Sequence, residues 1–398
     1  MKVLLVVPAV GDVYGGTSKI VVELARSLGA TGLRTDVVTT NANGTGDLDV
    51  PTGVWVDADG YRIKYFPYSK RGDYKFSFAL TRWMRRRVRD YDVVHTHAIF
   101  SYPVLPAHWF CHRNRVPYLM TPHGMLEPWA LSYKARKKSL YYRWVEQAAF
   151  NNARAVHVTS SPEVDSVRRL GIKAPVLYVP NGVDLTEFER AHDAAPFRER
   201  FPETGGKRLV LFLGRVDPKK GLDLLAPALR QLRDGRPDVH CVVAGPDNVG
   251  FEPAARGHFE RAGCADAVTF TGMLAGEMKH AALAAAAAYV APSYSEGFSM
   301  SILEGMASGL PCVFTKGCNF PEAAEAKVAR VVDADAGALA SALGEVLDDP
   351  AAADRMGAAA RDFVFNNYTW SHAAARLKDA YRAMMRPPVT GGAGGFAG

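Results

Sequence analysis

The sequence predicts an α/β protein built from two doubly wound parallel sheets, one in each of two domains. Three observations support this fold class. The chain has 398 residues, which is long for a single hydrophobic core. Short apolar runs of strand length recur along it, and stretches with helical spacing of apolar residues separate them. The alternation occurs in two series with a polar segment rich in turn residues between them, so we expect two domains.

The first series opens with a buried strand over 3–7, a glycine loop and a helix. The loop contains Gly15 and Gly16, the helix runs from residue 17 to about 28, and a second strand covers 37–40. Ligands of doubly wound sheets gather beyond the carboxyl ends of the strands. The loop is not a G-x-G-x-x-G sequence and no acidic residue ends the second strand, which disfavours a nicotinamide cofactor. The glycine pair either permits a tight turn or lets a ligand approach the backbone.

Histidines mark the ends of two later strands in this series. The strand over 92–97 carries His95 and His97 on one face, and His123 follows the strand over 118–121. Two imidazoles on one face can bind a metal ion, but no third ligand is nearby, so we favour a structural or substrate-facing role. A lone loop histidine is more often structural, yet His123 ends a parallel strand, where functional groups collect.

Two basic clusters, residues 82–89 and 134–144, interrupt the first half. Both interleave cations with aromatic residues, a composition typical of helices that lie on an anionic membrane. A solvated helix face is an equally weighted alternative, and no recognised nucleic-acid module accompanies the clusters. Residues 1–180 contain 25 Lys and Arg against 14 Asp and Glu, whereas residues 181–398 contain 23 against 27. The basic half is therefore expected to meet an anionic partner.

A turn-rich segment that includes Asn181 follows the strands over 156–159 and 176–179 and predicts a domain boundary near residue 185. The expected organisation is a first domain over 1–185, a second over 186–368, a last helix within 369–386 that packs back on the first domain, and a disordered glycine-rich tail over 387–398.

The second series begins with a buried strand over 209–213. Its loop carries Gly214, Arg215 and Lys220 and leads into a helix over 222–232. Cations at the start of a helix form an anion cradle, because the helix N-terminus is electropositive and Arg can bind phosphate oxygens in a bidentate manner. A solvated basic loop is the alternative reading. The sheet continues with strands over 239–244, 268–272, 289–291 and 312–314.

The stretch after the strand over 289–291 carries two carboxylates in a strand–turn–helix arrangement. Glu296 lies at the turn, a helix is predicted from Ser299 to Ser308, and Glu304 lies about one and a half turns into it. The helix N-terminus suits a phosphate oxygen, and a carboxylate can accept two sugar hydroxyls. Either Glu alone could be a solvated or dipole-complementing charge. For the pair in this setting we favour a shared binding site.

Other site classes are not indicated. The cysteines number five, are scattered and lack C-x-x-C spacing, which predicts reduced thiols in a cytosolic protein. Two D-x-D sequences, at 57–59 and 333–335, do not follow a nucleotide-binding strand, and Asp335 can cap a helix, so we assign no metal site. The opening apolar run over 3–7 is too short for a signal segment or a membrane span.

Taken in order, five motifs resemble those of the family 4 retaining glycosyltransferases (glycosyl transferases group 1), which have the GT-B fold of two Rossmann-like domains facing across a cleft. The glycine pair is weak evidence alone, but the ordered set is specific and spans nearly the whole chain. Ser299 departs from the Gly or Pro of many relatives, which leaves the donor sugar open. The motifs are Gly15-Gly16, Thr121-Pro122-His123-Gly124, Val179 to Asp184, Gly214-Arg215 with Lys220-Gly221, and Glu296 to Glu304.

The resemblance implies four catalytic residues. Arg215 and Lys220 would hold the diphosphate of a nucleotide-sugar and neutralise it as it leaves. Glu296 would touch the transferred sugar, and His123 would reach its anomeric end from the other domain. No second carboxylate suits a double displacement, so a front-face route is expected, in which the departing phosphate helps to deprotonate the acceptor.

The resemblance also implies a donor-binding set. Glu304 would accept the ribose hydroxyls, backbone N–H groups of residues 297–299 would meet phosphate or sugar oxygens, and the loop over 272–274 would lie near the base. The donor-binding candidates are Gly15, Gly16, Asn181, Gly214, Gly272, Met273, Leu274, Gly297, Phe298, Ser299 and Glu304.

The expected function is transfer of a sugar from a UDP- or GDP-sugar to a hydroxyl acceptor with retention, without cofactor or metal. The basic half suggests a lipid-linked glycan acceptor in cell-surface polysaccharide biosynthesis, and a cytoplasmic protein that is peripheral on the inner face of the membrane. Nucleic acid is not an expected partner. The alternatives are a nucleotide-sugar epimerase and a catalytically silent nucleotide-sugar or membrane-binding module.

Overall fold

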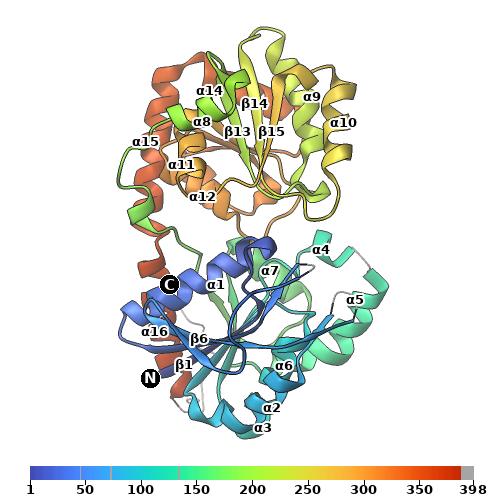
Figure 1. Cartoon of the computed structure of the whole chain (residues 1–398), viewed down its shortest axis with the longest axis vertical. Helices are drawn as coiled ribbons and strands as arrows, with labels where there is room; N and C mark the ends of the chain where they lie inside the picture. Colours follow the sequence, from blue (N-terminus) through green and yellow to red (C-terminus); the bar gives the residue numbers. More distant parts are fainter. Residues whose placement is uncertain (45, 72–73, 133–134, 387–398) are drawn as a thin grey trace. The chain divides into compact units, whose positions relative to one another are not determined.

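The structure is a computed structural model that describes residues 1–44, 46–71, 74–132 and 135–386 (Figure 1). It divides into two compact units. Unit 1 contains Met1–Gly182 and the segment that starts at Trp370, and unit 2 contains Val183–Thr369. The predicted disordered tail over 387–398 and Lys134 of the second basic cluster lie outside the described residues.

Unit 1 is built on an eight-stranded sheet in the order β12-β11-β10-β9-β1-β2-β6-β5. All neighbours pair in parallel except β5 with β6, which form an antiparallel hairpin that sequence reasoning missed. The strands are β1 (Lys2–Ala9), β2 (Arg34–Thr40), β5 (Trp55–Ala58), β6 (Tyr61–Phe66), β9 (Val93–His97), β10 (Tyr118–Thr121), β11 (Ala155–Val158) and β12 (Val176–Tyr178). Two short hairpins, β3 (Ala42–Asn43) with β4 (Gly46–Asp47) and β7 (Ser69–Arg71) with β8 (Tyr74–Phe76), stand outside this sheet.

Helices cover the sheet of unit 1. The helix α1 (Gly16–Ala30) buries Ile20, Val21, Leu24 and Leu28, the helical spacing that the sequence indicates. The last helix, α16 (Trp370–Met385), lies beside α1 in unit 1 (Figure 1). The others are α2 (Phe78–Arg87), α3 (Leu105–Asn114), α4 (Pro128–Ser132), α5 (Ala135–Tyr141), a π-helical turn (Tyr142–Glu146), α6 (Gln147–Asn152) and α7 (Ser161–Arg169).

Unit 2 contains a six-stranded parallel sheet in the order β15-β14-β13-β16-β17-β18. Its strands are β13 (Arg208–Leu213), β14 (Val239–Ala244), β15 (Val268–Gly272), β16 (Ala286–Ala291), β17 (Cys312–Thr315) and β18 (Arg330–Val332). Its helices are α8 (Ala195–Arg200), α9 (Leu222–Arg233), α10 (Glu252–Ala262), α11 (Gly276–Ala285), α12 (Met300–Ala307), α13 (Pro321–Glu325), α14 (Ala336–Asp348) and α15 (Pro350–Asn367).

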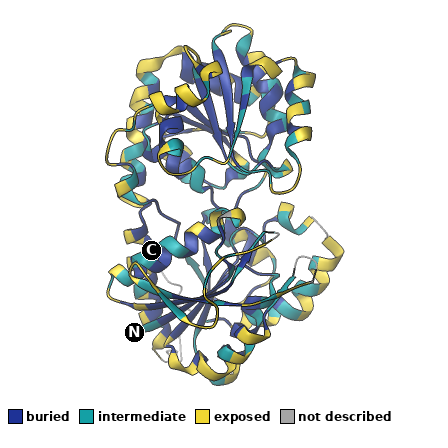
Figure 2. Cartoon of the chain, viewed as in Figure 1, coloured by how far each residue is buried: buried dark blue, intermediate teal, exposed yellow. Residues whose placement is uncertain are grey.

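The sheet of unit 2 separates two hydrophobic cores. Leu209, Leu211 and Leu213 of β13 join one core, and the alternating residues Val210 and Phe212 join the other, because successive side chains of a strand point to opposite faces. The strands are accordingly buried along most of their length (Figure 2). A sheet buried on both faces exposes its strand ends, and the candidate site residues lie there.

Several smaller expectations can be compared with the structure. Asp335 caps α14, since its Oδ1 accepts the Ala338 N–H at 2.9 Å. All five cysteines are free and buried. Among the described residues, no cluster of His, Cys, Asp and Glu could hold a metal ion. None of the described helices has the length and apolar character needed to cross a membrane.

Candidate functional site

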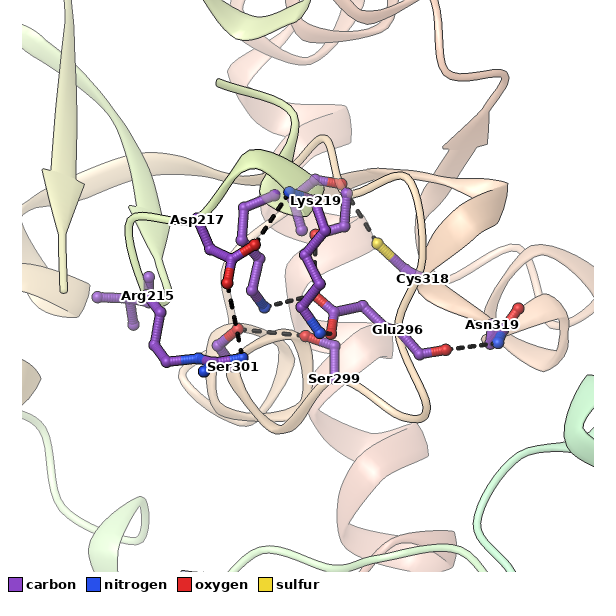
Figure 3. A network of polar contacts seen from close by, with 12 residues as sticks. Arg215, Asp217, Lys219, Glu296, Ser299, Ser301, Cys318 and Asn319 are labelled. Carbon is purple, nitrogen blue, oxygen red and sulfur yellow. Dashed lines mark hydrogen bonds and ion pairs between the residues drawn. The ribbon is translucent and has the colours of Figure 1, made fainter. Parts of the chain in front are cut away.

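In unit 2, Lys220 and Glu296 meet at the carboxyl ends of the neighbouring strands β13 and β16. The Nζ of Lys220 donates to Oε1 of Glu296, and the Nζ of Lys219 lies 3.7 Å from Oε2 (Figure 3). The Ser293 hydroxyl donates to Oε1 at 2.9 Å. Sequence reasoning had singled out Lys220 and missed Lys219, although the two are adjacent in one loop.

Backbone contacts fix the two loops against each other. The Tyr294 N–H donates to the Lys219 carbonyl at 2.8 Å. Gly221 has φ 71°, and a Cβ at this position would lie 2.0 Å from the Pro292 carbonyl oxygen. Only glycine permits this approach. This backbone contact places the loop so that Lys219 and Lys220 lie next to Glu296, and the flexibility of their side chains is not the only reason that they reach it.

The backbone of Glu296 is held from the opposite side. Its N–H donates to the Gly317 carbonyl at 2.8 Å, and Nδ2 of Asn319 donates to its carbonyl at 2.6 Å (Figure 3). A Cβ at Gly317 would lie 2.5 Å from the Ser293 carbonyl oxygen. The carboxylate is therefore presented by a backbone that is fixed on both sides, which favours a preorganised site.

The charges of this cluster depend on one another. Burial alone disfavours the charged carboxylate of Glu296, but the attraction of Lys220 and Lys219 and the hydrogen bonds from Lys220 and Ser293 outweigh it and lower its pKa to about 2. Burial lowers the pKa of Lys219, partly opposed by Glu296 and reinforced by Lys220 and Arg215. With Glu296 ionised, the nearby cations Lys219, Lys220 and Arg215 outnumber its single carboxylate.

Arg215 extends the cationic cluster. Its guanidinium lies 4.0 Å from the Asp217 carboxylate and its side chain is 37% exposed, so its donors remain accessible. Asp217 caps the short helical turn Pro218–Lys220 by accepting the Lys219 N–H at 3.1 Å. A Cβ at Gly214 would lie 3.2 Å from Cζ of Phe212, which is a tight contact, and 3.6 Å from the Lys220 Nζ, which is an ordinary one.

The N-terminus of α12 follows Glu296 directly. Within the part of the chain that the structure describes, the N–H groups of Gly297, Phe298 and Ser299 have no backbone acceptor, as expected for an anion-binding terminus. The Phe298 ring packs against Phe320 and Tyr368 in the core, so Phe298 offers a ligand only its backbone. Ser299 is the N-cap residue of α12, but its side chain makes no cap hydrogen bond. Its hydroxyl lies 3.2 Å from that of Ser301, close enough for the two to bond each other.

Glu304 is buried on α12 and forms an ion pair that sequence reasoning missed. The Nζ of Lys279, on α11, donates to Glu304 at 3.0 Å and to Glu187 at 3.3 Å. Lys279 is a lone cation in an alanine-rich helix, and that isolation was the signal in the sequence. The pair orients the carboxylate, as an acceptor of hydroxyl groups requires.

The loop after β15 contains the remaining donor-binding candidates of unit 2. Gly272 ends the strand with φ 70°, and its carbonyl accepts the Gly245 N–H at 2.8 Å. The Met273 side chain is exposed, and Leu274 packs partly against the core. This loop can therefore offer an apolar surface to a flat ring.

In unit 1, the loop after β10 holds His123. Nε2 of His123 lies 3.0 Å from Nδ1 of His97, and His123 adopts the left-handed conformation at φ 52°. Strain of this kind persists where surrounding contacts hold it. The neighbouring Gly124 N–H donates to the buried carboxylate of Glu163, on α7, which also accepts the Thr159 N–H at 2.8 Å. Burial, and the proximity of His157, lower the pKa of His123, which is therefore neutral near pH 7.

A buried chain of hydrogen bonds runs beneath this loop, and its direction follows from chemistry. Burial lowers the pKa values of His157 and His95, so both imidazoles are neutral near pH 7 and each carries one ring N–H. The Val179 carbonyl can only accept, so Nε2 of His157 donates to it at 2.7 Å and Nδ1 of His157 accepts from Thr121 at 2.9 Å. Nε2 of His95 then donates to Thr121 at 2.6 Å, and Tyr381 of α16 donates to Nδ1 of His95 at 2.7 Å. His95 therefore has a structural role in this chain of hydrogen bonds, one of the two roles that the sequence left open.

The other candidates of unit 1 are Gly15, Gly16 and Asn181. Gly15 precedes α1 with φ 70°, and a Cβ at Gly16 would meet no atom within 4 Å, which leaves space for a ligand at the helix N-terminus. Asn181 is buried after β12. The structure thus brings Arg215, Lys220, Glu296 and the start of α12 together in unit 2. Gly15, Gly16, Asn181 and His123 belong to unit 1.

The two basic clusters differ in how they present their aromatic residues. In the first, Trp83 packs against Trp55 and Phe66, so it is not free to enter a membrane interface as expected. In the second, Trp144 is 74% exposed and Leu140 61% exposed. Only the second cluster combines exposed apolar side chains with cations.

Comparison with known proteins identifies the family to which the chain belongs. Residues 14–187 match the family described as Glycosyltransferase Family 4, and residues 193–363 match Glycosyl transferases group 1. D-inositol 3-phosphate glycosyltransferase from Streptomyces avermitilis is 29% identical, over 95% of this chain and 85% of the relative. Glycogen synthase from Mycobacterium tuberculosis is 30% identical, over 74% of this chain and 69% of the relative.

The fold also matches a solved structure, HepE from Anabaena in complex with UDP and glucose. The TM-score is 0.76 at 17% identity, and the match covers 96% of this chain and all of that chain. The two parallel-sheet units with their order of motifs, the matches over both halves and the relatives lead to one assignment: the chain belongs to the family 4 glycosyltransferases and has the GT-B fold.

Proposed function

We propose that this glycosyltransferase transfers a sugar from a nucleoside-diphosphate sugar to a hydroxyl group with retention, and that it needs no metal. The observation that carries the proposal is the cluster of Arg215, Lys219 and Lys220 around Glu296 at the start of α12. Its cations and N–H groups are the chemistry that neutralises a departing diphosphate. HepE, which shares the fold, binds UDP and glucose, which supports a nucleotide-sugar donor.

Each residue has a distinct role in the proposal. Arg215 and the two lysines stabilise the charge that develops on the leaving diphosphate, which in turn accepts the proton of the attacking hydroxyl in a front-face route. Glu296 receives hydroxyls of the transferred sugar, and its low pKa keeps it ionised for that purpose. Glu304, oriented by Lys279, accepts the ribose hydroxyls. His123 acts as a neutral hydrogen-bonding group, a role that the resemblance supports.

Purified protein incubated with UDP- and GDP-sugars tests the proposal. A matching donor should raise the melting temperature, since a ligand that binds only the folded state stabilises it. Donor consumption should require an acceptor and continue after chelation of divalent metal, and the product should keep the anomeric configuration of the donor. Conversion of donor alone would indicate an epimerase, and binding without consumption would indicate a silent module. Either outcome would reject the proposal.

We propose that the acceptor is a lipid-linked glycan at the inner face of a membrane, and that the second basic cluster contacts this membrane. Its support is the exposure of Trp144 and Leu140 next to the exposed cations Arg136, Lys137 and Arg143. The Streptomyces relative is named for D-inositol 3-phosphate, so phosphate-bearing acceptors belong in the same screen. Co-sedimentation with anionic vesicles should weaken with salt and in Trp144→Ala, and salt-insensitive or absent binding would remove this part of the proposal.

A further inference from the structure

A second cationic cavity lies in unit 1, apart from the residues of the proposed donor site. It has a volume of about 680 Å³, within the range of small-molecule sites, and lies between β6 and α2. Arg62, Lys64 and Phe66 alternate along β6, so their side chains share the face that α2 covers. We call this cavity the β6–α2 pocket.

The lining of the β6–α2 pocket is strongly positive. Its only acidic lining residue is Asp90, among residues that are all described. Two of its cations share the buried carboxylate of Asp36, at 2.9 Å from Arg62 and 3.7 Å from Lys2. The six cations of the pocket are Lys2, Arg62, Lys64, Arg82, Arg86 and Arg87.

Half of these cations have no anionic partner. Arg87 pairs with Asp90 at 3.4 Å. For Lys64, Arg82 and Arg86, the described residues supply no carboxylate within ion-pair distance. Uncompensated like charges around a concavity repel one another and focus a positive potential into it.

Lys64 makes the imbalance costly, because it is not a solvated surface lysine. The residue is 9% exposed, and its Nζ lies 4.9 Å from the ring centre of Trp55 and 5.9 Å from that of Trp83. Burial, and then repulsion by Arg87 and Arg62, lower the pKa of Lys64, and the attraction of Asp36 opposes them only in part. The two tryptophans attract the ammonium only modestly, so a bound anion would favour its charged form.

We propose that the β6–α2 pocket binds the phosphate group of a ligand about the size of a lipid headgroup, through Lys64, Arg82 and Arg86. Arginine guanidinium groups and a buried ammonium bind the several oxygens of a phosphate better than they bind a single carboxylate. The tryptophans limit competition from water. The volume exceeds what a bare phosphate fills, so the ligand has a larger polar body. None of the lining residues belongs to the proposed donor-binding or catalytic set, so the inference goes beyond the proposed function.

Four full-length proteins test the inference: wild type, Lys64→Met, Arg86→Gln and the control Arg85→Gln. Arg85 is an exposed cation of the same helix that does not line the pocket. Titration calorimetry with inorganic pyrophosphate measures a free phosphate ligand, and co-sedimentation with phosphatidylcholine vesicles with and without phosphatidylglycerol measures a lipid headgroup. Any pyrophosphate bound at the donor site is common to all four proteins and cancels in the comparison.

The two pocket variants should each weaken binding about tenfold, the effect of one lost charge-assisted contact, whereas Arg85→Gln should bind as wild type does. Loss confined to pyrophosphate identifies a free phosphate ligand, and loss confined to phosphatidylglycerol vesicles identifies a headgroup. Equal binding by all four proteins in both assays, or an equal loss in the Arg85→Gln control, would overturn the inference. Arg86 is exposed, so its variant should fold even if Lys64→Met does not, and unchanged donor affinity separates this result from a failure of the donor site.

Discussion

The Nζ of Lys220 donates to the carboxylate of Glu296 across 76 residues of sequence. The contact exists because β13 and β16 are neighbours in the sheet and the Tyr294 N–H ties their loops together at the Lys219 carbonyl. In the proposed function, Lys220 interacts with the leaving diphosphate and Glu296 with the transferred sugar. Substitutions at these two residues therefore test the proposed chemistry most directly.

Lys220→Ala and Arg215→Ala should each lower kcat on the order of 100-fold or more, because each removes a preorganised charge that stabilises the leaving diphosphate. Steady-state kinetics with the matching donor measures the effect. Arg230→Ala is the control, since Arg230 is an exposed cation of α9 that pairs with Asp234 at 3.0 Å. Near-wild-type turnover in either site variant would refute the assignment.

The stability of unit 2 should fall with acid through Glu296. Its pKa is about 2 in the folded protein and about 4.3 in an unfolded chain, so its stabilisation is complete above the unfolded value and is lost as the pH falls from there to about 2. The shift corresponds to about 3 kcal/mol. Urea unfolding of wild type and Glu296→Gln should show a stability gap at pH 7 that narrows toward pH 3. A gap that does not depend on pH would contradict the ion-pair explanation.

Glu304→Ala should raise the KM for the donor about tenfold to a hundredfold with a smaller change in kcat, because it removes an acceptor that binds the ribose equally in ground and transition states. Lys279 would keep its contact with Glu187 at 3.3 Å in this variant. Glu187→Ala, the matched control, removes the other partner of Lys279 and should leave the KM unchanged. If both variants behave alike, Glu304 orients the lysine and does not contact the donor.

The sequence predicted the parts of the site that lie at strand ends. Buried apolar runs marked the strands, and in parallel sheets the residues just beyond them gather at one edge, so Arg215, Lys220 and Glu296 could be proposed together. The resemblance assigned Phe298 a role through its backbone N–H, and its side chain packs in the core.

Partners supplied by the middle of helices could not be predicted. Lys279 of α11 contacts Glu304 within unit 2, and Glu163 of α7 contacts Gly124 within unit 1; the direction of each side chain depends on how its helix packs against its own sheet. The same limit explains why the packing of Trp83 was not predicted. Interleaved cations and aromatics suggested a membrane face, but the unpredicted β5–β6 hairpin covers the ring with Trp55.

Unit 1 should become less stable as the pH rises through the titration of Glu146. This residue is fully buried in the π-helical turn, and burial, opposed by a hydrogen bond from the Phe100 N–H, raises its pKa to about 7. Its favourable contribution is complete below the unfolded value of about 4.3 and is lost as the pH rises to about 7. The stability of Glu146→Gln relative to wild type should therefore improve by up to about 3 kcal/mol between pH 4 and pH 8. A constant difference would show that folding does not raise the pKa of Glu146.

Glu163→Gln should lower kcat with little change in the KM for the donor, although Glu163 lies outside the set of proposed catalytic residues. Its carboxylate accepts the N–H groups of Gly124 and Thr159 and so holds the loop that keeps His123 in the left-handed conformation. A glutamine can offer one acceptor oxygen, but its amide group would face the second N–H donor, and the loop should shift. Thr159→Val, which removes only the side-chain contact of Thr159 to Glu163 at 3.1 Å, is the control and should retain more activity. A lower melting temperature with unchanged kcat would mean that Glu163 stabilises the fold without positioning His123.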